Sequence, residues 1–261
     1  MRVEGIQHAD PSRPPEPGPG LGSPALSIAV LLNSYRSPFI AAIRDSYVRA
    51  IGSVSPESRL AFFYPVERDG DFPDPREFDL IVVGGGNLDP RRDSSCIRSV
   101  HDFIRETVRA HPGKKLCGIC WGHQTIARVF GGVVADMEVP ELGVTEVALT
   151  AAGHKFFPAP AGRAFLRVQQ HHRREVAVAP AGFVELARGR QCLLNWGNTI
   201  LTFQGHPEKD AETAKLRLAD SERWFGTCLG DEVALEKLRG SMEVEHDGRW
   251  IWERVLQWAR E

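Results

Sequence analysis

The 261-residue sequence lacks an excess of either charge sign, because 32 Lys and Arg residues face 34 Asp and Glu residues and leave a net charge of −2. A nucleic-acid-binding protein needs a basic surplus to neutralise phosphates, so this class of function is disfavoured. The sequence also lacks any apolar run near the roughly 20 residues that span a bilayer. Its longest clear run, 25–32, has the size of a strand, so a membrane role is disfavoured as well.

Cysteine is scarce, and the five cysteines are Cys96, Cys117, Cys120, Cys192 and Cys228. An odd, widely spaced set does not form the framework of a disulfide-rich secreted protein and is typical of a reducing compartment. The first 24 residues are rich in Pro and Gly and lack the apolar core of a secretory signal. We therefore expect residues 1–24 to be a disordered leader and the protein to be cytoplasmic.

Downstream of the leader, short apolar runs alternate with amphipathic stretches. Strands are predicted at 26–32, 60–64, 78–83 and 116–119, and helices at 37–52, 94–111 and 121–130. Alternating units of this length predict an α/β fold, in which a mostly parallel sheet is flanked by helices on both faces.

Residues 133–203 are richer in strand-forming residues. Further strands are predicted there at 144–150, 165–169, 183–187, 192–195 and 200–203. From about residue 209 the pattern becomes amphipathic and predicts a helical C-terminal tail. The sequence has no internal repeat and no second compositional regime, so we expect one domain over residues 25–261.

The segment Gly118-Ile-Cys120-Trp-Gly122-His-Gln124 lies where a short predicted strand passes into a helix. A cysteine flanked by glycines at such a turn predicts a nucleophile elbow, because the turn forces the central residue into a strained backbone conformation. The sulfur of Cys120 would point outward at a helix N-terminus, where the helix dipole favours the thiolate. The backbone N–H of Trp121 would be one donor of an oxyanion hole.

Other interpretations of Cys120 compete with the elbow. Cys117 and Cys120 form a C-x-x-C pair, which could be a redox pair or half of a zinc site. A zinc site would need a second pair, which the sequence does not contain. A redox pair would not by itself require Gly118, Gly122 and Gln124. Cys120 could also be a small buried hydrophobic residue.

The segment Gly205-His206-Pro207-Glu208 follows the predicted strand at 200–203. A cysteine nucleophile needs a base to take up and return a proton, and the base needs a third group to fix its tautomer and orientation. His206 and Glu208 supply both groups, and Pro207 stiffens the spacing between them. A lone histidine at a strand end is usually structural, but this pattern downstream of a cysteine elbow favours catalysis.

The two motifs resemble those of the class I glutamine amidotransferase family, G-x-C-x-G-x-Q and G-H-P-E, and the resemblance extends in order over residues 26–208. It implies a three-layer, flavodoxin-like sheet with an added antiparallel β segment. It also implies a triad in which Cys120 is the nucleophile, His206 the general base and then general acid, and Glu208 the orienting carboxylate. Gln124 and His172 match positions on the substrate-binding side, and the resemblance implies no cofactor and no metal.

Two further segments carry the resemblance. The three glycines at 84–86 match the family's glycine-rich oxyanion turn, and the backbone N–H groups of Gly85 and Gly86 would face the oxyanion beside Trp121. Taken alone, such a run would indicate a plain β-turn. Residues 172–176 are similar to the family pattern H-x-D-x-V, but Arg174 stands in place of Asp. This departure affects recognition of the substrate amine rather than the hydrolytic core.

The resemblance implies a cysteine hydrolase that cleaves a γ-glutamyl amide, in glutamine or in a γ-glutamyl peptide or conjugate, through a γ-glutamyl thioester. The elbow's G-I-C-x-G-H-Q form is similar to that of γ-glutamyl peptidases. Residues 209–261 carry no nucleotide-binding motif, so we expect no attached synthetase domain.

Three alternatives to this function stay open. The protein could be an ammonia-donating subunit for a separate synthetase or biosynthetic partner. It could be a non-catalytic binding or regulatory member of the family. It could also be a redox sensor that uses Cys117 and Cys120. The sensor hypothesis predicts that Cys117→Ser is as damaging as Cys120→Ser, whereas the hydrolase hypothesis predicts a mild effect of Cys117→Ser.

Overall fold

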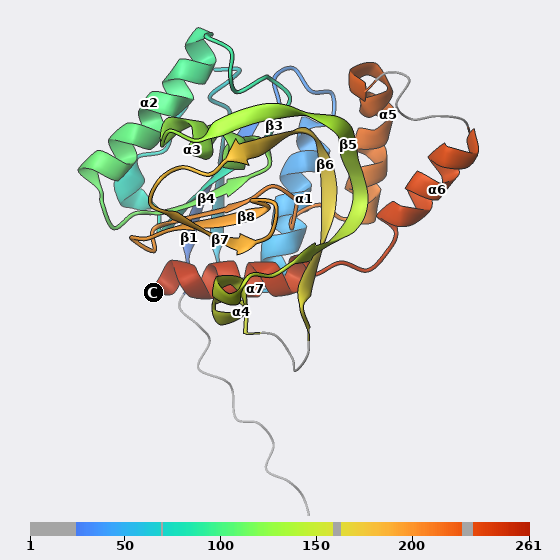
Figure 1. Ribbon diagram of the computed structural model, residues 1–261. Coiled ribbons are helices and arrows are strands. Elements are labelled where there is room, and N and C mark those ends of the chain that lie inside the picture. Colours follow the sequence, from blue (N-terminus) through green and yellow to red (C-terminus); the bar gives the residue numbers. More distant parts are fainter. Residues whose placement is uncertain (1–24, 69, 159–162, 226–231) are drawn as a thin grey trace, which may run out of the picture.

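A computed structural model of the protein describes residues 25–68, 70–158, 163–225 and 232–261, without the side chains of 219–225 and 232–234. The predicted leader, 1–24, lies outside the described residues. The described chain is built around a seven-stranded sheet and a separate two-stranded ribbon (Figure 1). None of its described helices has both the length and the apolar character needed to cross a bilayer.

The sheet is parallel over five strands and antiparallel over the last two. In spatial order its strands are β2 (Arg59–Phe63), β1 (Ser27–Asn33), β3 (Leu80–Gly86), β4 (Lys115–Ile119), β9 (Ile200–Phe203), β8 (Cys192–Asn195) and β7 (Phe183–Ala187). This mostly parallel order confirms the predicted α/β fold class.

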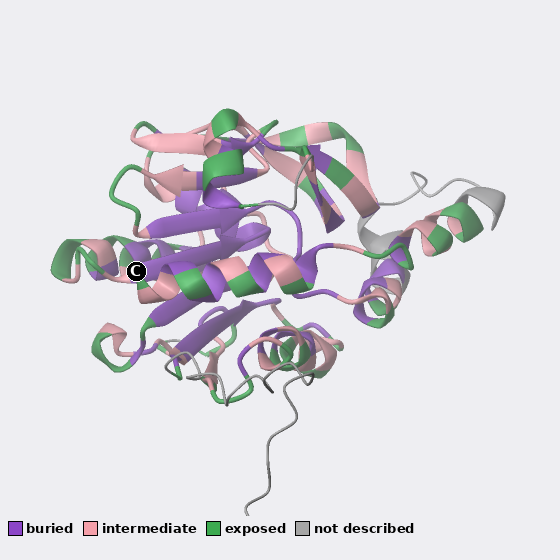
Figure 2. Cartoon of the chain, turned by 90° about the horizontal axis from the view of Figure 1, so that it is seen from below, coloured by how far each residue is buried: buried purple, intermediate pink, exposed green. Residues whose placement is uncertain are grey.

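Helices cover both faces of the sheet because its central strands are apolar on both sides. On β1, Ile28, Val30 and Leu32 face a core shared with α1 (Ile40–Gly52) and α7 (Gly248–Arg260). Ala29 and Leu31 face the opposite core, shared with α2 (Ser95–Ala110) and α3 (Trp121–Val129). Figure 2 shows the resulting buried strands between two more exposed helical layers. The three predicted layers are therefore present.

The added antiparallel segment is a long ribbon of β5 (Val133–Ala148) and β6 (Phe165–Val178), which arches over the sheet in Figure 1. Both strands extend beyond the predictions of 144–150 and 165–169. Charged residues such as Asp136, Glu141 and Arg174 interrupt the apolar alternation there, and the pairing register shifts between Asp136 and Glu141. Because the ribbon is only half-buried, its pattern is too polar to identify the full strands from the sequence.

The remaining elements are short or lie at the C-terminal end. The 3₁₀ helix η1 (Pro75–Glu77) and helix α4 (Ala151–Phe156) were not predicted. Helix α4 begins at an N-cap, since the Thr150 hydroxyl accepts a hydrogen bond from Gly153 N at 3.0 Å. The predicted helical tail consists of α5 (Ala211–Phe225), α6 (Glu232–Met242) and α7. The division of the chain at residues 24 and 209 stays a prediction.

The predicted site residues meet at one edge of the sheet. Strands β3, β4 and β9 are parallel neighbours, so their carboxyl ends lie side by side. Gly85 and Gly86 end β3, Cys120 directly follows β4, and His206 comes shortly after β9. Ligands of open α/β sheets bind at this kind of edge.

Candidate active site

Cys120 is held in a strained turn between β4 and α3. Its backbone has φ 52° and ψ −101°, outside the regions that L-residues favour. A Cβ at Gly122 would lie 1.8 Å from the carbonyl oxygen of Val83, and one at Gly118 would lie 2.9 Å from backbone atoms of Gly122. Only glycine fits at both flanking positions, so the elbow geometry predicted from the sequence is present.

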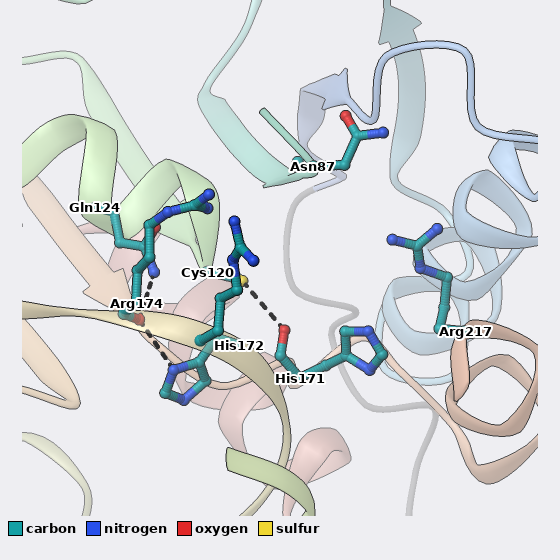
Figure 3. Close-up of a pocket in the computed structure, with 9 residues that line it drawn as sticks. Asn87, Cys120, Gln124, His171, His172, Arg174 and Arg217 are labelled. Carbon is teal, nitrogen blue, oxygen red and sulfur yellow. Dashed lines mark hydrogen bonds between the residues drawn. The ribbon is translucent and has the colours of Figure 1, made fainter. Parts of the chain in front are cut away.

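Two cavities meet at Cys120. Four residues line both of them: Gly86, Cys120, His171 and Arg217. The first, which we call the His206 cavity, is also lined by Ser34, Ile43, Ser46, Gly85, His206, Glu208, Lys209 and Thr213. The second, which we call the arginine cavity, is also lined by Asn87, Gln124, His172, Arg173 and Arg174 (Figure 3). A bound molecule could therefore extend to both sides of the sulfur.

His206 and Glu208 form a buried pair in the first cavity. The Nδ1 atom of His206 lies 2.6 Å from Oε1 of Glu208. The backbone N–H of His206 donates to the carbonyl oxygen of Gln169 at 2.8 Å, which ties this turn to β6. A Cβ placed on Gly85 would lie 3.0 Å from His206 Cε1 and 4.0 Å from Cys120 Cβ, so both side chains flank the same glycine.

Burial decides the protonation states of these groups. It raises the pKa of the Cys120 thiol to about 11, although Lys209 acts in the opposite direction. Burial, together with the charge of Lys209, lowers the pKa of His206 to about 4 against the opposing effect of Glu208. Burial alone would raise the pKa of Glu208, but His206 and Lys209 outweigh it and hold that pKa below its usual value.

These values correct one expectation from the sequence. The helix N-terminus at Cys120 was expected to favour the thiolate, but loss of solvent is the larger effect on its pKa. At neutral pH the resting site therefore contains a thiol, a neutral imidazole and a carboxylate. A neutral imidazole is the form that can accept a proton.

The backbone groups expected to form an oxyanion hole lie around the sulfur. Gly86 lines both cavities, and the backbone N–H of Trp121 hydrogen-bonds to the Cys120 sulfur and lowers its pKa. A Cβ at Gly86 would lie 2.7 Å from the Asn33 carbonyl oxygen and 2.9 Å from the Trp121 ring. Neighbouring atoms thus leave no room for side chains on the glycine run. A plain β-turn would not require such close packing.

Gln124 and His172 line the arginine cavity, but protein partners already hold their side chains (Figure 3). The Gln124 amide donates to the carbonyl oxygen of Arg174 at 2.8 Å. The His172 ring lies 3.0 Å from the same carbonyl through Nδ1 and 3.0 Å from Glu141 Oε2 through Nε2. Both residues therefore fix the course of β6 along the cavity wall.

Several residues that line the cavities were not predicted from the sequence, and three of them are close to the predicted triad. The carbonyl oxygen of His171 lies 3.9 Å from the Cys120 sulfur, Lys209 is buried beside Glu208, and Arg217 reaches the site from α5. Burial lowers the pKa of Lys209 to about 8. Lys209 directly follows the G-H-P-E motif, which could have drawn attention to it. No pattern in the sequence indicated Arg217.

The alternative chemistry of the C-x-x-C pair has little support in the geometry. Cys117 is fully buried in the core, and both Cys117 and Cys120 are free thiols. Burial raises the pKa of Cys117 far above its ordinary value. Within the described ranges, no group of three or more His, Cys, Asp or Glu side chains is arranged to hold a metal ion.

Comparisons with known proteins agree with the motifs. The family model of class-I glutamine amidotransferases matches residues 60–224. A glutamine amidotransferase-like protein, chyE of Penicillium rubens, is 34% identical over 239 residues, which cover 90% of this chain and 98% of that protein. γ-Glutamyl peptidase 3 of Arabidopsis thaliana is 26% identical over 72% of this chain and 78% of its own length.

Two further matches concern assembly and fold. One of the subunits of a glutamine-hydrolysing GMP synthase from Sulfolobus acidocaldarius is 30% identical over 51% of this chain and 69% of its own length. The crystal structure of a glutamine amidotransferase from Thermotoga maritima superposes with a TM-score of 0.67 at 17% identity, covering 92% of this chain and all of that one. The family match, the relative in Penicillium and the shared fold lead to one conclusion: the chain belongs to the class-I glutamine amidotransferase family.

Proposed function

We propose that the protein hydrolyses γ-glutamyl amide bonds, in glutamine or in γ-glutamyl peptides and conjugates, through a thioester on Cys120. The observation that carries the proposal is the buried His206–Glu208 pair, 2.6 Å apart, in the same cavity as a cysteine on a strained elbow. The similarity to a γ-glutamyl peptidase supports the choice of bond.

In the first step, His206 takes the thiol proton as the sulfur of Cys120 attacks the γ-carbonyl carbon. The backbone N–H groups of Gly85, Gly86 and Trp121 stabilise the negative charge that develops on the carbonyl oxygen. Glu208 holds the imidazole in orientation and stabilises its protonated form. The C–N bond then breaks, and His206 gives its proton to the leaving amine.

In the second step, water attacks the thioester. His206 removes a proton from the water, and the C–S bond breaks with return of that proton to the sulfur. The products are free glutamate and the regenerated Cys120 thiol. The first step requires neutral His206, which matches its lowered pKa of about 4.

From the position of His206 we also propose which part of the substrate each cavity holds. The general acid must lie beside the leaving nitrogen, so the leaving group belongs in the His206 cavity. The acyl group then extends to the other side of Cys120, into the arginine cavity.

The proposal is tested by measuring glutamate released from glutamine, glutathione and a glutathione S-conjugate by the purified protein. Cys120→Ala should reduce the rate by at least about 10³-fold, because it removes the nucleophile. Cys117→Ala is the matched control, since this thiol is buried in the core, and it should leave most of the activity.

Each alternative has its own outcome in this assay. Release from glutamine only after addition of a synthetase would favour the ammonia-donating subunit. Equal loss of activity in the Cys117 and Cys120 variants would favour the redox sensor. Absence of glutamate from every substrate, from a folded protein, would contradict hydrolysis and favour a non-catalytic member of the family.

A further inference from the structure

Lys209 is a buried cation in the cavity to which we assign the leaving group. It directly follows Glu208, is only 5% exposed and lines the His206 cavity. Burial lowers the pKa of its ammonium to about 8, so most Lys209 side chains still carry their positive charge at pH 7. The proposed mechanism gives this charge no part in moving protons, so its presence in the cavity needs another explanation.

The Lys209 ammonium has no direct partner within the described part of the chain, where no hydrogen bond or ion pair joins it to another residue. Two acids flank it in the chain, but both bind other groups. Glu208 lies 2.6 Å from His206, and Asp210 lies 2.7 Å from Arg49. A buried cation that lacks a hydrogen-bond partner is costly. An anionic group on a bound ligand would supply the missing partner.

The leaving nitrogen would enter the same cavity as this cation. Glu208 occupies Nδ1 of His206, so Nε2 is the ring atom that carries the proton to the leaving nitrogen. Lys209, His206 and Cys120 all line this cavity. The charge of Lys209 lowers the pKa of both Cys120 and His206, so it acts on both groups between which the proton passes. A substituent next to the leaving nitrogen would therefore share the cavity with the ammonium.

We propose that Lys209 binds a carboxylate on the leaving group, so that the preferred substrates are γ-glutamyl derivatives of α-amino acids. This inference rests on the proposed function and names its leaving group. An α-amino acid carries its carboxylate on the carbon that bears the leaving nitrogen, whereas the ammonia that leaves from glutamine carries no such group. An ammonium binds a carboxylate through charge-assisted hydrogen bonds, which are stronger than hydrogen bonds between neutral groups.

Cleavage of such a substrate uses the same two steps. The C–S bond forms as the C–N bond breaks, and the thiol proton passes through His206 to the nitrogen of the amino acid. Water then releases glutamate and restores the thiol. The thioester is identical for every γ-glutamyl substrate, so contacts with the leaving group act only on the steps up to its formation. The preference should therefore be measured as kcat/KM, which reports those steps.

Two substrates that differ only in the carboxylate test the inference. γ-Glutamylalanine carries it, and γ-glutamylalaninamide has a neutral carboxamide in its place. We expect kcat/KM, measured from released glutamate, to be more than about 10-fold higher for γ-glutamylalanine, as loss of a hydrogen bond to a charged group predicts. A ratio of about 10 or less, or cleavage of only glutamine or glutathione, would overturn the inference and leave the proposed function intact. No cleavage of any of the four compounds would overturn both.

Variants of Lys209 show whether this residue causes the preference. Lys209→Met keeps an unbranched side chain but removes the charge, so the ratio of the two kcat/KM values should fall towards one. Comparing both substrates in one variant cancels any effect of Lys209 on Cys120 and His206, because both reactions use these groups. Lys209→Arg should retain part of the preference, since it keeps the charge. An unchanged ratio in folded Lys209→Met would show that another group selects the carboxylate, and would overturn the assignment.

Lys215→Met is the matched control, because it removes the same charge a short way along the chain. Lys215 lies on α5, pairs with Glu243 and does not line either of the two cavities. The ratio of the two kcat/KM values in this variant should equal that of the wild-type protein. A fall as large as in Lys209→Met would show that the preference reflects overall charge, and would contradict direct binding of the carboxylate by Lys209.

Discussion

At the scale of single residues, burial sets the charges of the three side chains to which we assign the reaction. Cys120, His206 and Glu208 are each less than a tenth exposed, so the charge of each depends on its neighbours rather than on solvent. The thiol and the imidazole stay neutral, and Glu208 is ionised beside Lys209. In the proposed mechanism, proton transfer from Cys120 to His206 is therefore part of the attack and does not precede it.

This arrangement predicts the pH dependence of hydrolysis. Protonated His206 cannot accept the thiol proton, so kcat/KM should fall as the pH drops through about 4. Glu208 raises the pKa of His206, so Glu208→Gln should move this acid limb to still lower pH. The Glu208→Gln substitution should also reduce kcat at pH 7 by roughly 10²- to 10⁴-fold. As a control for unfolding, activity should recover after return to pH 7. An acid limb near pH 6.5 would contradict the assignment of this limb to buried His206.

Gly85 gives a second prediction at this scale. A methyl group there would lie 3.0 Å from His206 Cε1, tighter than ordinary contact, so Gly85→Ala should displace the imidazole. We expect kcat to fall by roughly 10- to 100-fold, because small misplacements of reacting groups are costly. The midpoint of urea unfolding should change little. Wild-type kcat in this variant would show that Gly85 does not set the position of His206.

At the scale of elements, the turn from β4 to α3 depends on close packing against β3. Gly122→Ala would bring a methyl group within 1.8 Å of the Val83 carbonyl oxygen, which is backbone and cannot rotate away. We expect a loss of at least about 3 kcal/mol in unfolding free energy, from overpacking and forced backbone movement.

Gly52→Ala is the matched control for this substitution. Gly52 ends α1, has no atom within 4 Å of an added Cβ, and should gain roughly 0.5–1 kcal/mol from the better helix propensity of alanine. Both values come from urea unfolding curves. Equal stability of the two variants would contradict the proposed packing of the elbow.

The elements also show what the sequence could and could not predict. The elbow and the His206–Glu208 pair are local motifs, so their residues and spacing are visible in the sequence. Arg217 reaches Cys120 only because α5 packs beside β6, and that tertiary contact leaves no periodic signal. The ribbon of β5 and β6 was predicted too short because its half-exposed strands carry charged residues.

At the scale of the whole molecule, buried histidines link stability to pH. Burial lowers the pKa of five histidines: His101, His123, His171, His206 and His246. Below their ordinary pKa near 6.5, the unfolded chain binds protons that the folded chain does not, down to about pH 4 for His101 and His206 and about pH 3 for His123. The unfolding free energy should therefore decrease as the pH falls through this window.

We expect a loss on the order of 1 kcal/mol from each of His101, His123 and His206, whose pKa values are lowered to about 4, 3 and 4, between pH 7 and pH 5, measured by urea unfolding at both values. His101→Leu should reduce the total loss by about one such contribution, because His101 lies buried on α2, outside the two cavities. Equal stability at pH 7 and pH 5 would contradict the buried, neutral state of these side chains.

We propose that Cys120 forms a thioester with a γ-glutamyl group, and labelling of the protein with a γ-glutamyl electrophile tests this step. The labelled protein would be digested and the modified residue identified by mass spectrometry. We predict one label per chain, on Cys120, with Cys117 unmodified and with labelling abolished in His206→Ala at neutral pH. Labelling of another residue, or no labelling of the folded wild-type protein, would contradict nucleophilic attack by Cys120.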